Sequence, residues 1–238
     1  MKYIINKIIV TIFIITGVLL VGCYKQQTDY KKDPHTIDPH IYKTTWQYMN
    51  DRANGTAPAD TIFRLMLQGI QYAEIDSNIY KQTGKTFILL ANDAIRRIAS
   101  STIQPDCFFG ANLVNNKTVT KWTDYPKDFV KNYLLYLVLD GVFDHYTLPA
   151  SDNVLATSIA PAGSLTSLPT GVTRNSTYPF IANANSGMKL KVLNSSPSNT
   201  SDYPVALNDL LNVRTSSILA TNGSIHVIDR FLTTTIPE

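Results

Sequence analysis

The stretch ILATNGSIHVIDRFL, from Ile218 to Leu232, joins two apolar runs through the dipeptide Asn222-Gly223. Asn-Gly is the preferred pair for a type I′ turn, in which both central residues need a positive φ. The stretch therefore predicts an antiparallel hairpin close to the end of the chain. It also places His226 between β-branched residues, and a lone histidine in such a run is more often a satisfied core group than a ligand.

The length and composition limit the classes of protein to which this chain can belong. The 238 residues suit one large domain or a small domain with insertions, and 44% of them are hydrophobic, which is ample for a core. The formal charge is +3, but Lys2 and Lys7 lie in a segment that we expect to be removed, which leaves 19 basic and 18 acidic residues. No basic surface large enough to argue for a nucleic-acid partner remains.

The first residues have the pattern of a bacterial lipoprotein signal. A basic start precedes an apolar run of about 15 residues, which is short for a membrane-spanning helix and suits a signal-peptide core. The run ends in Leu20-Val21-Gly22-Cys23, which resembles a lipobox. We therefore expect a signal peptide over residues 1–22, a lipid on Cys23 and anchoring to the outer membrane of a Gram-negative envelope, on a face that the sequence leaves open. The alternative is a plain signal peptide, or a short span, with a chance cysteine.

The next segment, residues 23–40, is polar and contains two prolines, which indicates a tether. Its two Asp-Pro-His triplets could offer metal ligands, but the prolines keep them from sharing one face of a helix. If Cys23 carries a lipid, Cys107 is the one thiol left in the mature protein. Its neighbours Phe108 and Phe109 favour burial as a small hydrophobic group.

In the globular region, residues 41–238, two helices are expected from apolar spacing and end signals alone. Apolar residues recur at helical spacing over 63–70, and Asp60 is a candidate N-cap. A second helix is expected to begin at Pro126, a residue favoured in the first turn, and to stop at Gly141.

Strands are expected in several places. The apolar run 87–90 indicates a strand that leads into a helix over 94–99, capped by Asn92 or Asp93. Residues 142–148 alternate like a strand. The region 149–187 is rich in Ser, Thr, Pro, Ala and Asn and predicts short strands and loops with little helix, and MKLKVLN after it is a further strand.

Three segments resemble, in the same order, the signatures of the fasciclin domain. KTFILLANDAI is similar to the first signature, NYLLYLVLDGVF to the middle segment, and SSILATNGSIHVIDRFL to the second signature. The last match is the specific one, and together the three cover most of residues 41–238. The resemblance implies an α+β fold with a twisted antiparallel β-core, shaped as a wedge, and a helical layer on its N-terminal side.

The resemblance also implies structural roles for the signature residues, with Asp229 and Arg230 paired where the hairpin closes onto the core. Loops beyond a minimal fasciclin unit are expected near 101–124 and 150–187, and such loops are where a binding specificity is placed. The signature residues are Phe87, Asn92, Ala94, Tyr136, Asn222, Gly223, His226 and Asp229.

The sequence departs from the family where animal matrix members bind integrins. Leu137 stands where a histidine is expected after the tyrosine, and Ser217 where an aspartate would meet the metal of a receptor. Integrin binding is therefore not carried over to this chain.

No catalytic constellation stands out in the sequence. There is no glycine-rich phosphate loop, His-Glu-x-x-His, paired-cysteine metal site or Gly-x-Ser-x-Gly. A thiolate at Cys107 would be desolvated by its aromatic neighbours, and Asp144 and His145 would point to opposite faces of a strand. We therefore expect neither an enzyme nor a metal or cofactor.

The expected function is a lipid-anchored envelope protein whose fasciclin domain mediates adhesion or extracellular binding to protein or glycan. The alternative is an accessory glycan-capturing lipoprotein of a polysaccharide-uptake system. Four aromatic residues could stack on sugars in that case, although a place in the core or on the ordinary surface is the more common role: Trp46, Trp122, Tyr125 and Tyr178.

Overall fold

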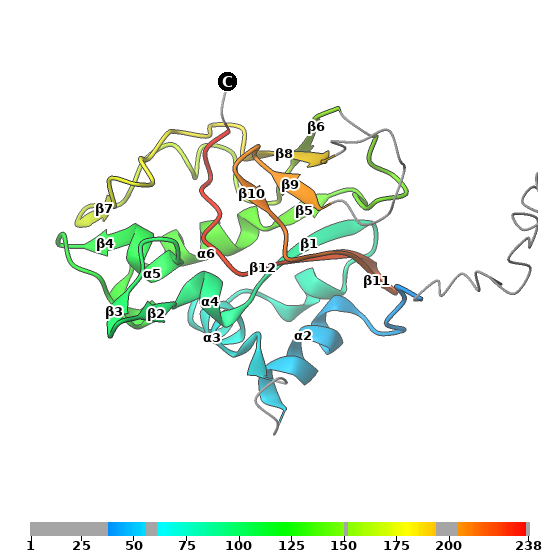
Figure 1. Ribbon diagram of the computed structural model, residues 1–238, viewed down its shortest axis with the longest axis horizontal. Helices are drawn as coiled ribbons and strands as arrows, with labels where there is room; N and C mark the ends of the chain where they lie inside the picture. Colours follow the sequence, from blue (N-terminus) through cyan, green and yellow to red (C-terminus); the bar gives the residue numbers. More distant parts are fainter. Residues whose placement is uncertain (1–37, 56–60, 150–151, 194–203, 237–238) are drawn as a thin grey trace, which may run out of the picture. The chain divides into compact units, whose positions relative to one another are not determined.

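Two four-stranded sheets form the framework of the chain from Pro39 onward (Figure 1). The computed structural model describes residues 38–55, 61–149, 152–193 and 204–236. The expected signal peptide, Cys23, nearly all of the tether and the candidate cap Asp60 lie outside these residues. The first sheet has the order β11-β12-β1-β5 and the second the order β10-β9-β8-β6. Their strands are β1 Lys85–Leu90, β5 Val138–Asp140, β6 Val154–Thr157, β8 Gly187–Val192, β9 Val205–Leu207, β10 Leu211–Asn212, β11 Thr215–Ala220 and β12 Gly223–Ile228.

Short elements complete the fold, which is mixed α+β. Two strand pairs are β2 Ile98–Ala99 with β3 Thr102–Ile103, and β4 Asn112–Val114 with β7 Val172–Arg174. The helices are α2 Thr45–Asn54, α3 Arg64–Tyr72, α4 Asn92–Ile95, α5 Phe108–Ala111 and α6 Lys127–Tyr136, with 3₁₀ helices η2 Ser77–Lys81 and η3 Trp122–Asp124. In the described ranges, no helix is both long and apolar enough to cross a membrane.

The centre of the first sheet is a parallel pair. Strand β1 runs parallel to β12 over six residues, from Lys85 opposite Gly223 to Leu90 opposite Ile228, and antiparallel to β5 on its other side. The expected antiparallel β-core is therefore wrong at this central pair, while the other strand pairs of the described residues are antiparallel. The sequence of β1 fits a central strand, because all its residues after Lys85 are buried and a strand covered on both faces has a continuous apolar run.

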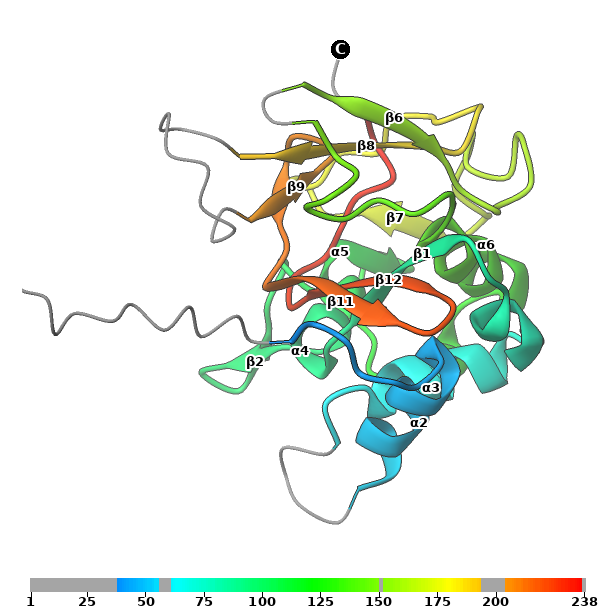
Figure 2. The ribbon, with the colours of Figure 1, turned by 90° about the vertical axis from the view of Figure 1, so that its right-hand side faces the viewer.

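The two sheets are connected at the end of β5. Leu139 forms an antiparallel bridge with Ser158, and the amide of Ile159 donates to the carbonyl of Val138 at 2.9 Å. The residues just after β6 therefore pair with β5 at the edge of the first sheet, while β6 itself pairs with β8 in the second sheet. Figures 1 and 2 show α2 and α3 on one side of the first sheet and the second sheet on the other.

The predicted hairpin is confirmed, but its turn is not the predicted one. Strands β11 and β12 pair antiparallel with Ala220 opposite Gly223, so that Thr221 and Asn222 form the loop, and neither has a positive φ. The positive-φ pair of a type I′ turn lies instead between β9 and β10. Asn208 and Asp209 have φ of 52° and 55° there, which asparagine and aspartate tolerate better than most residues.

Helix α2 was not predicted from the sequence, whereas helix α3 was, and both bury an apolar face. Helix α2 begins with a capping box, in which Thr44 and Gln47 each bond the backbone of the other, and it buries Met49 and Ala53. Helix α3 buries Met66 and Ile70 on the predicted face.

Helix α6 ends earlier than predicted, at Tyr136 rather than near Gly141. The next residues form β5 and pair with β1, for example Val138 with Phe87, so that sheet formation overrides the helical pattern. The strand expected over 142–148 is wrong as well, because that segment is a turn in which the carboxylate of Asp144 accepts from the amides of Tyr146 and Thr147.

The helix after β1 is shorter than predicted. Helix α4 ends at Ile95, and residues 98–99 form β2. Neither Asn92 nor Asp93 caps it, because the preceding residue Ala91 occupies the N-cap position without a side-chain bond. The side chain of Asn92 bonds instead to the backbone at the start of α3.

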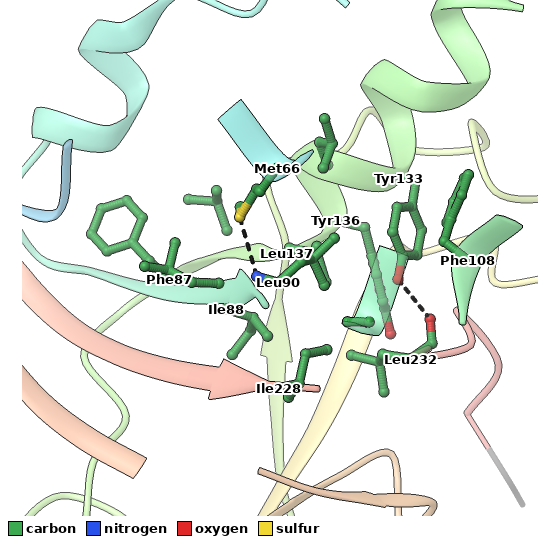
Figure 3. Packing of buried hydrophobic residues seen from close by; sticks show 14 of the residues in the cluster. Met66, Phe87, Ile88, Leu90, Phe108, Tyr133, Tyr136, Leu137, Ile228 and Leu232 are labelled. Carbon is green, nitrogen blue, oxygen red and sulfur yellow. Dashed lines mark hydrogen bonds between the residues drawn. The ribbon is translucent and has the colours of Figure 1, made fainter. Parts of the chain in front are cut away.

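A large aromatic cluster fills the core in the region expected to be an extra loop. Phe108 is fully buried, with its ring 5.0 Å from that of Trp122, 4.7 Å from Tyr133 and 6.0 Å from Phe231. Figure 3 shows Phe108 beside Tyr133, whose hydroxyl donates to the carbonyl of Leu232 at 3.2 Å. Part of 101–124 is therefore core rather than surface loop.

Replacing Gly223 by alanine should be costly, because a Cβ there would lie 1.9 Å from the carbonyl oxygen of Lys85 in the neighbouring strand. We expect the free energy of unfolding to fall by about 3 kcal/mol, since β1 and β12 must separate. Gly84→Ala is the matched control: its φ is +71° but nothing lies within 4 Å, so we expect a loss of about 1 kcal/mol. Urea denaturation measures both losses, and equal losses would contradict the close approach.

Candidate functional site

Asn222 holds two distant parts of the chain against the start of β12. Its buried carboxamide oxygen accepts from the amide of Thr45 at 2.8 Å, at the first turn of α2. Its nitrogen donates to the carbonyls of Tyr80 at 3.1 Å and Gln82 at 3.0 Å. These bonds need one side chain that both donates and accepts hydrogen bonds, and the carboxamide of Asn222 does both.

Asn92 has a similar role at the other end of the parallel pair. Its side chain accepts from the amide of Leu65 at 3.0 Å and donates to the carbonyl of Thr61 at 2.7 Å. It therefore caps the N-terminus of α3, not that of its own helix. The two signature residues on either side of it, Phe87 and Ala94, are fully buried.

Tyr136 is also fully buried, and its hydroxyl accepts from the carboxamide of Asn208 at 2.8 Å. Asn208 donates as well to the carbonyl of Thr233 at 3.1 Å and accepts from the amide of Lys189 at 3.0 Å. The middle signature is thus tied to the second sheet and to the C-terminal segment. Burial raises the pKa of Tyr136.

The imidazole of His226 is fully buried between two backbone groups. The amide of Ser217 donates to Nδ1 at 3.2 Å, which requires Nδ1 to be an acceptor. Nε2 therefore carries the proton and donates to the carbonyl of Phe143, 2.8 Å away. Ser217 reaches this position through a β-bulge in β11, with φ of 57°. Burial lowers the pKa of His226 to about 4, so the ring is neutral near pH 7.

A polar cluster lies beside His226. Nδ1 of His145 is 2.6 Å from Oγ of Ser217, and the amide of His145 donates to the same oxygen at 3.0 Å. Asp144 is buried and its carboxylate accepts from the backbone of its own turn. Asp144 and His145 therefore do not lie on opposite faces of a strand as expected, and the cluster fixes the turn after β5 against β11.

Asp229 and Arg230 are neighbours in an ion network at the end of β12. Nη1 of Arg230 lies 3.4 Å from Oδ2 of Asp229 and donates to its carbonyl at 2.8 Å. Nε of Arg230 lies 3.0 Å from Oδ2 of Asp106, which also meets Nη1 of Arg97 at 2.7 Å. The network therefore ties the C-terminal segment to the loop before α5.

The candidate binding site is a groove beside this network, with a volume of about 450 Å³. This is within the range of small-ligand sites. Its walls come from the 177–181 loop, residues 210–211 and the C-terminal segment 230–235. They are mainly apolar, with Asp106 and Arg230 as the charged groups. Two wall residues are large, apolar and exposed, Ile181 at 53% and Leu210 at 55%.

The C-terminal wall of the groove is held in place by buried side chains. The carbonyls of Leu232, Thr233 and Thr234 accept from Tyr133, Asn208 and Asn183 respectively. The amide of Phe231 donates to the carbonyl of Asp106 at 2.8 Å. The groove is therefore preformed on that side.

The aromatic residues considered for sugar stacking lie in different places. Trp122 and Tyr125 are buried in the core cluster, and Trp46 packs against Tyr80. Tyr178 is half-buried and lines the groove. Its presence there is the part of the site that the sequence indicated, whereas Leu210 was missed although it is an apolar residue in a polar turn.

Cys107 is buried, as predicted, and burial raises the pKa of its thiol. Among the described residues, no three His, Cys, Asp or Glu side chains gather in a way that could hold a metal ion.

A scan against models of protein families finds no match to this chain, and a search of curated proteins finds no significant match either.

His226 should make stability depend on pH. The folded-state pKa of His226, about 4, lies below the usual 6.5. Between these two pH values the unfolded chain therefore binds a proton at His226, whereas the folded protein does not. Stability from this group is full above pH 6.5 and is lost as the pH falls toward 4, by about 3 kcal/mol in all. We expect His226→Gln to be less stable than wild type at pH 7.5, with a gap that narrows on acidification. Urea denaturation between pH 7.5 and 4.5 tests this, and a gap that does not change with pH would contradict it.

Proposed function

We propose that this chain is a lipid-anchored protein of the outer membrane with a fasciclin-like domain that binds an extracellular protein or glycan and has no catalytic task. The observation that carries the proposal is the groove, which combines exposed apolar residues with a preformed wall and a charged end.

The fasciclin-like assignment is supported by the spatial relation of the signatures. The first signature supplies β1 and the second supplies β11 and β12, and β1 pairs with β12 along its whole length. Segments far apart in sequence thus meet at the centre of the fold. The two signature asparagines bind helix N-termini at opposite ends of this pair.

The anchoring proposal rests on the sequence. Cys23 follows a basic start, an apolar run and a small residue, as lipid attachment requires. A lipid-modified N-terminus would hold the domain at the membrane through its buried acyl chains.

The groove favours a ligand that presents apolar groups. Ile181 and Leu210 are exposed at the mouth, where burial against a partner would remove apolar surface from water. Arg230 has two carboxylate neighbours, so the charged end has little excess charge to attract an ion. An apolar side chain of an extracellular protein fits these walls.

A glycan ligand, as in the alternative of an accessory lipoprotein for polysaccharide uptake, has one observation in its favour. Tyr178 lines the same groove, with threonine hydroxyls and the Asp106–Arg230 pair nearby. An aromatic ring can stack on the apolar C–H face of a pyranose, and the nearby polar groups can hydrogen-bond to its hydroxyls.

Substitutions in the groove test the proposed ligand surface. We expect Leu210→Glu and Ile181→Glu to weaken binding to protein ligands on an array of extracellular proteins and glycans by about tenfold or more. Leu155→Glu is the matched control, because Leu155 is 67% exposed and lies outside the groove walls. All three variants should retain their melting temperature. If the wild type binds glycans but no protein, the glycan-capturing alternative is favoured. If Leu210→Glu and Ile181→Glu bind the ligand as well as the Leu155→Glu control does, the groove is not the ligand surface.

Lipid attachment is tested by labelling cells with a fatty-acid analogue. Wild type should incorporate the label and Cys23→Ala should not, because the thiol is the acceptor. Cys107→Ala controls for the second cysteine and should label like wild type. Equal labelling of the Cys23 variant would contradict the proposal.

A further inference from the structure

Arg174, the last residue of β7, lies over aromatic rings near the C-terminal segment. Its guanidinium carbon is 4.8 Å from the ring centre of Phe231 and 5.9 Å from that of Phe180. Such rings attract a cation, but they accept no conventional hydrogen bond from the edge of the guanidinium.

The side chain lines a small cavity of about 20 Å³ together with Ser164 and Asn132. Nε and Nη1 of Arg174 and Oγ of Ser164 are buried and have no hydrogen-bond partner among the described residues. The turn that carries Ser164 is fixed, because the amide of Gly163 donates to the carbonyl of Ala184 and the carbonyl of Leu165 accepts from Asn183, both at 2.9 Å. The two residues that carry these three unpartnered groups therefore line the same cavity.

The charge of Arg174 has no acidic counterpart in the described part of the chain. No carboxylate there lies within 4.0 Å of its guanidinium, whereas Arg97 and Arg230, which are also partly buried, both meet Asp106. Burial lowers the pKa of Arg174 to about 10, which leaves it protonated at neutral pH. A partly buried cation without a counter-charge is unfavourable, and nearby groups that compensate it stabilise the fold.

We propose that this cavity binds a monatomic halide anion, chloride under ordinary conditions, between Arg174 and Ser164. Nε–H and Nη1–H of Arg174 and the Ser164 hydroxyl donate to the ion, which supplies the missing negative charge. The cavity volume is on the order of what a single water molecule or a monatomic ion needs. Organic carboxylate ions, which carry a carbon chain, are too large for this cavity. The site is separate from the groove, but both contact the segment around Phe231.

Thermal unfolding of the full chain in detergent tests the site. At constant ionic strength, replacing sodium gluconate by sodium chloride or bromide should raise the melting temperature by about 2–5 °C, in a saturable way. Gluconate is too large for the cavity. Arg174→Gln should abolish the response, and Ser164→Ala should weaken the apparent halide affinity about fivefold by removing one donor. Arg214→Gln, at an exposed arginine, is the matched control and should respond like wild type.

Bromide also gives a direct readout. In bromide-soaked crystals, an anomalous peak between Arg174 and Ser164 would locate the ion in wild-type protein even if Arg174→Gln fails to fold. Equal melting temperatures of the wild type in chloride, bromide and gluconate would overturn the proposal, as would a full halide response in Arg174→Gln. Anomalous peaks at other places only would mean that this cavity holds water.

Discussion

The parallel pairing of β1 with β12 is the constraint on which the rest of the structure depends. Parallel strands cannot be joined by a tight turn, so the chain between Leu90 and Gly223 must leave the first sheet and return to it. On the way it builds the second sheet, most of the aromatic core and the groove walls at 177–181 and 210–211. The close approach of Gly223 to Lys85 and the two asparagine caps fix where this pair meets the helices.

Local patterns predicted the elements whose stability is local, and missed those that depend on distant partners. The β11–β12 hairpin and the buried face of α3 follow from residues close together in the sequence. The register of β1 against β12 joins segments far apart in sequence, and no short pattern encodes it. The same reason explains the early end of α6, since residues 138–140 satisfy a helical pattern but gain more by pairing with β1. Asn92 was expected to cap the nearest helix and caps α3 instead.

The candidate site was even less accessible from the sequence. Burial of His226 could be expected from its β-branched neighbours, but its bond to Phe143 requires the turn after β5, which was predicted as a strand. The groove is assembled from three segments that share no pattern. The sequence carried only a weak signal for the groove, namely a large apolar residue, Leu210, in a polar turn.

The C-terminal segment shows how a wall without strand pairing becomes a fixed surface. Buried carbonyl groups outside a sheet need other donors, and in this segment Tyr133, Asn208 and Asn183 supply one each to three consecutive residues. Each donor comes from a different part of the chain, so the segment is held only when the whole domain has folded. A ligand in the groove therefore meets a wall whose conformational entropy was already lost on folding, and less of its binding energy is spent on ordering that wall. The signature residue Tyr136 contributes indirectly, because it binds the carboxamide of Asn208 that orders Thr233.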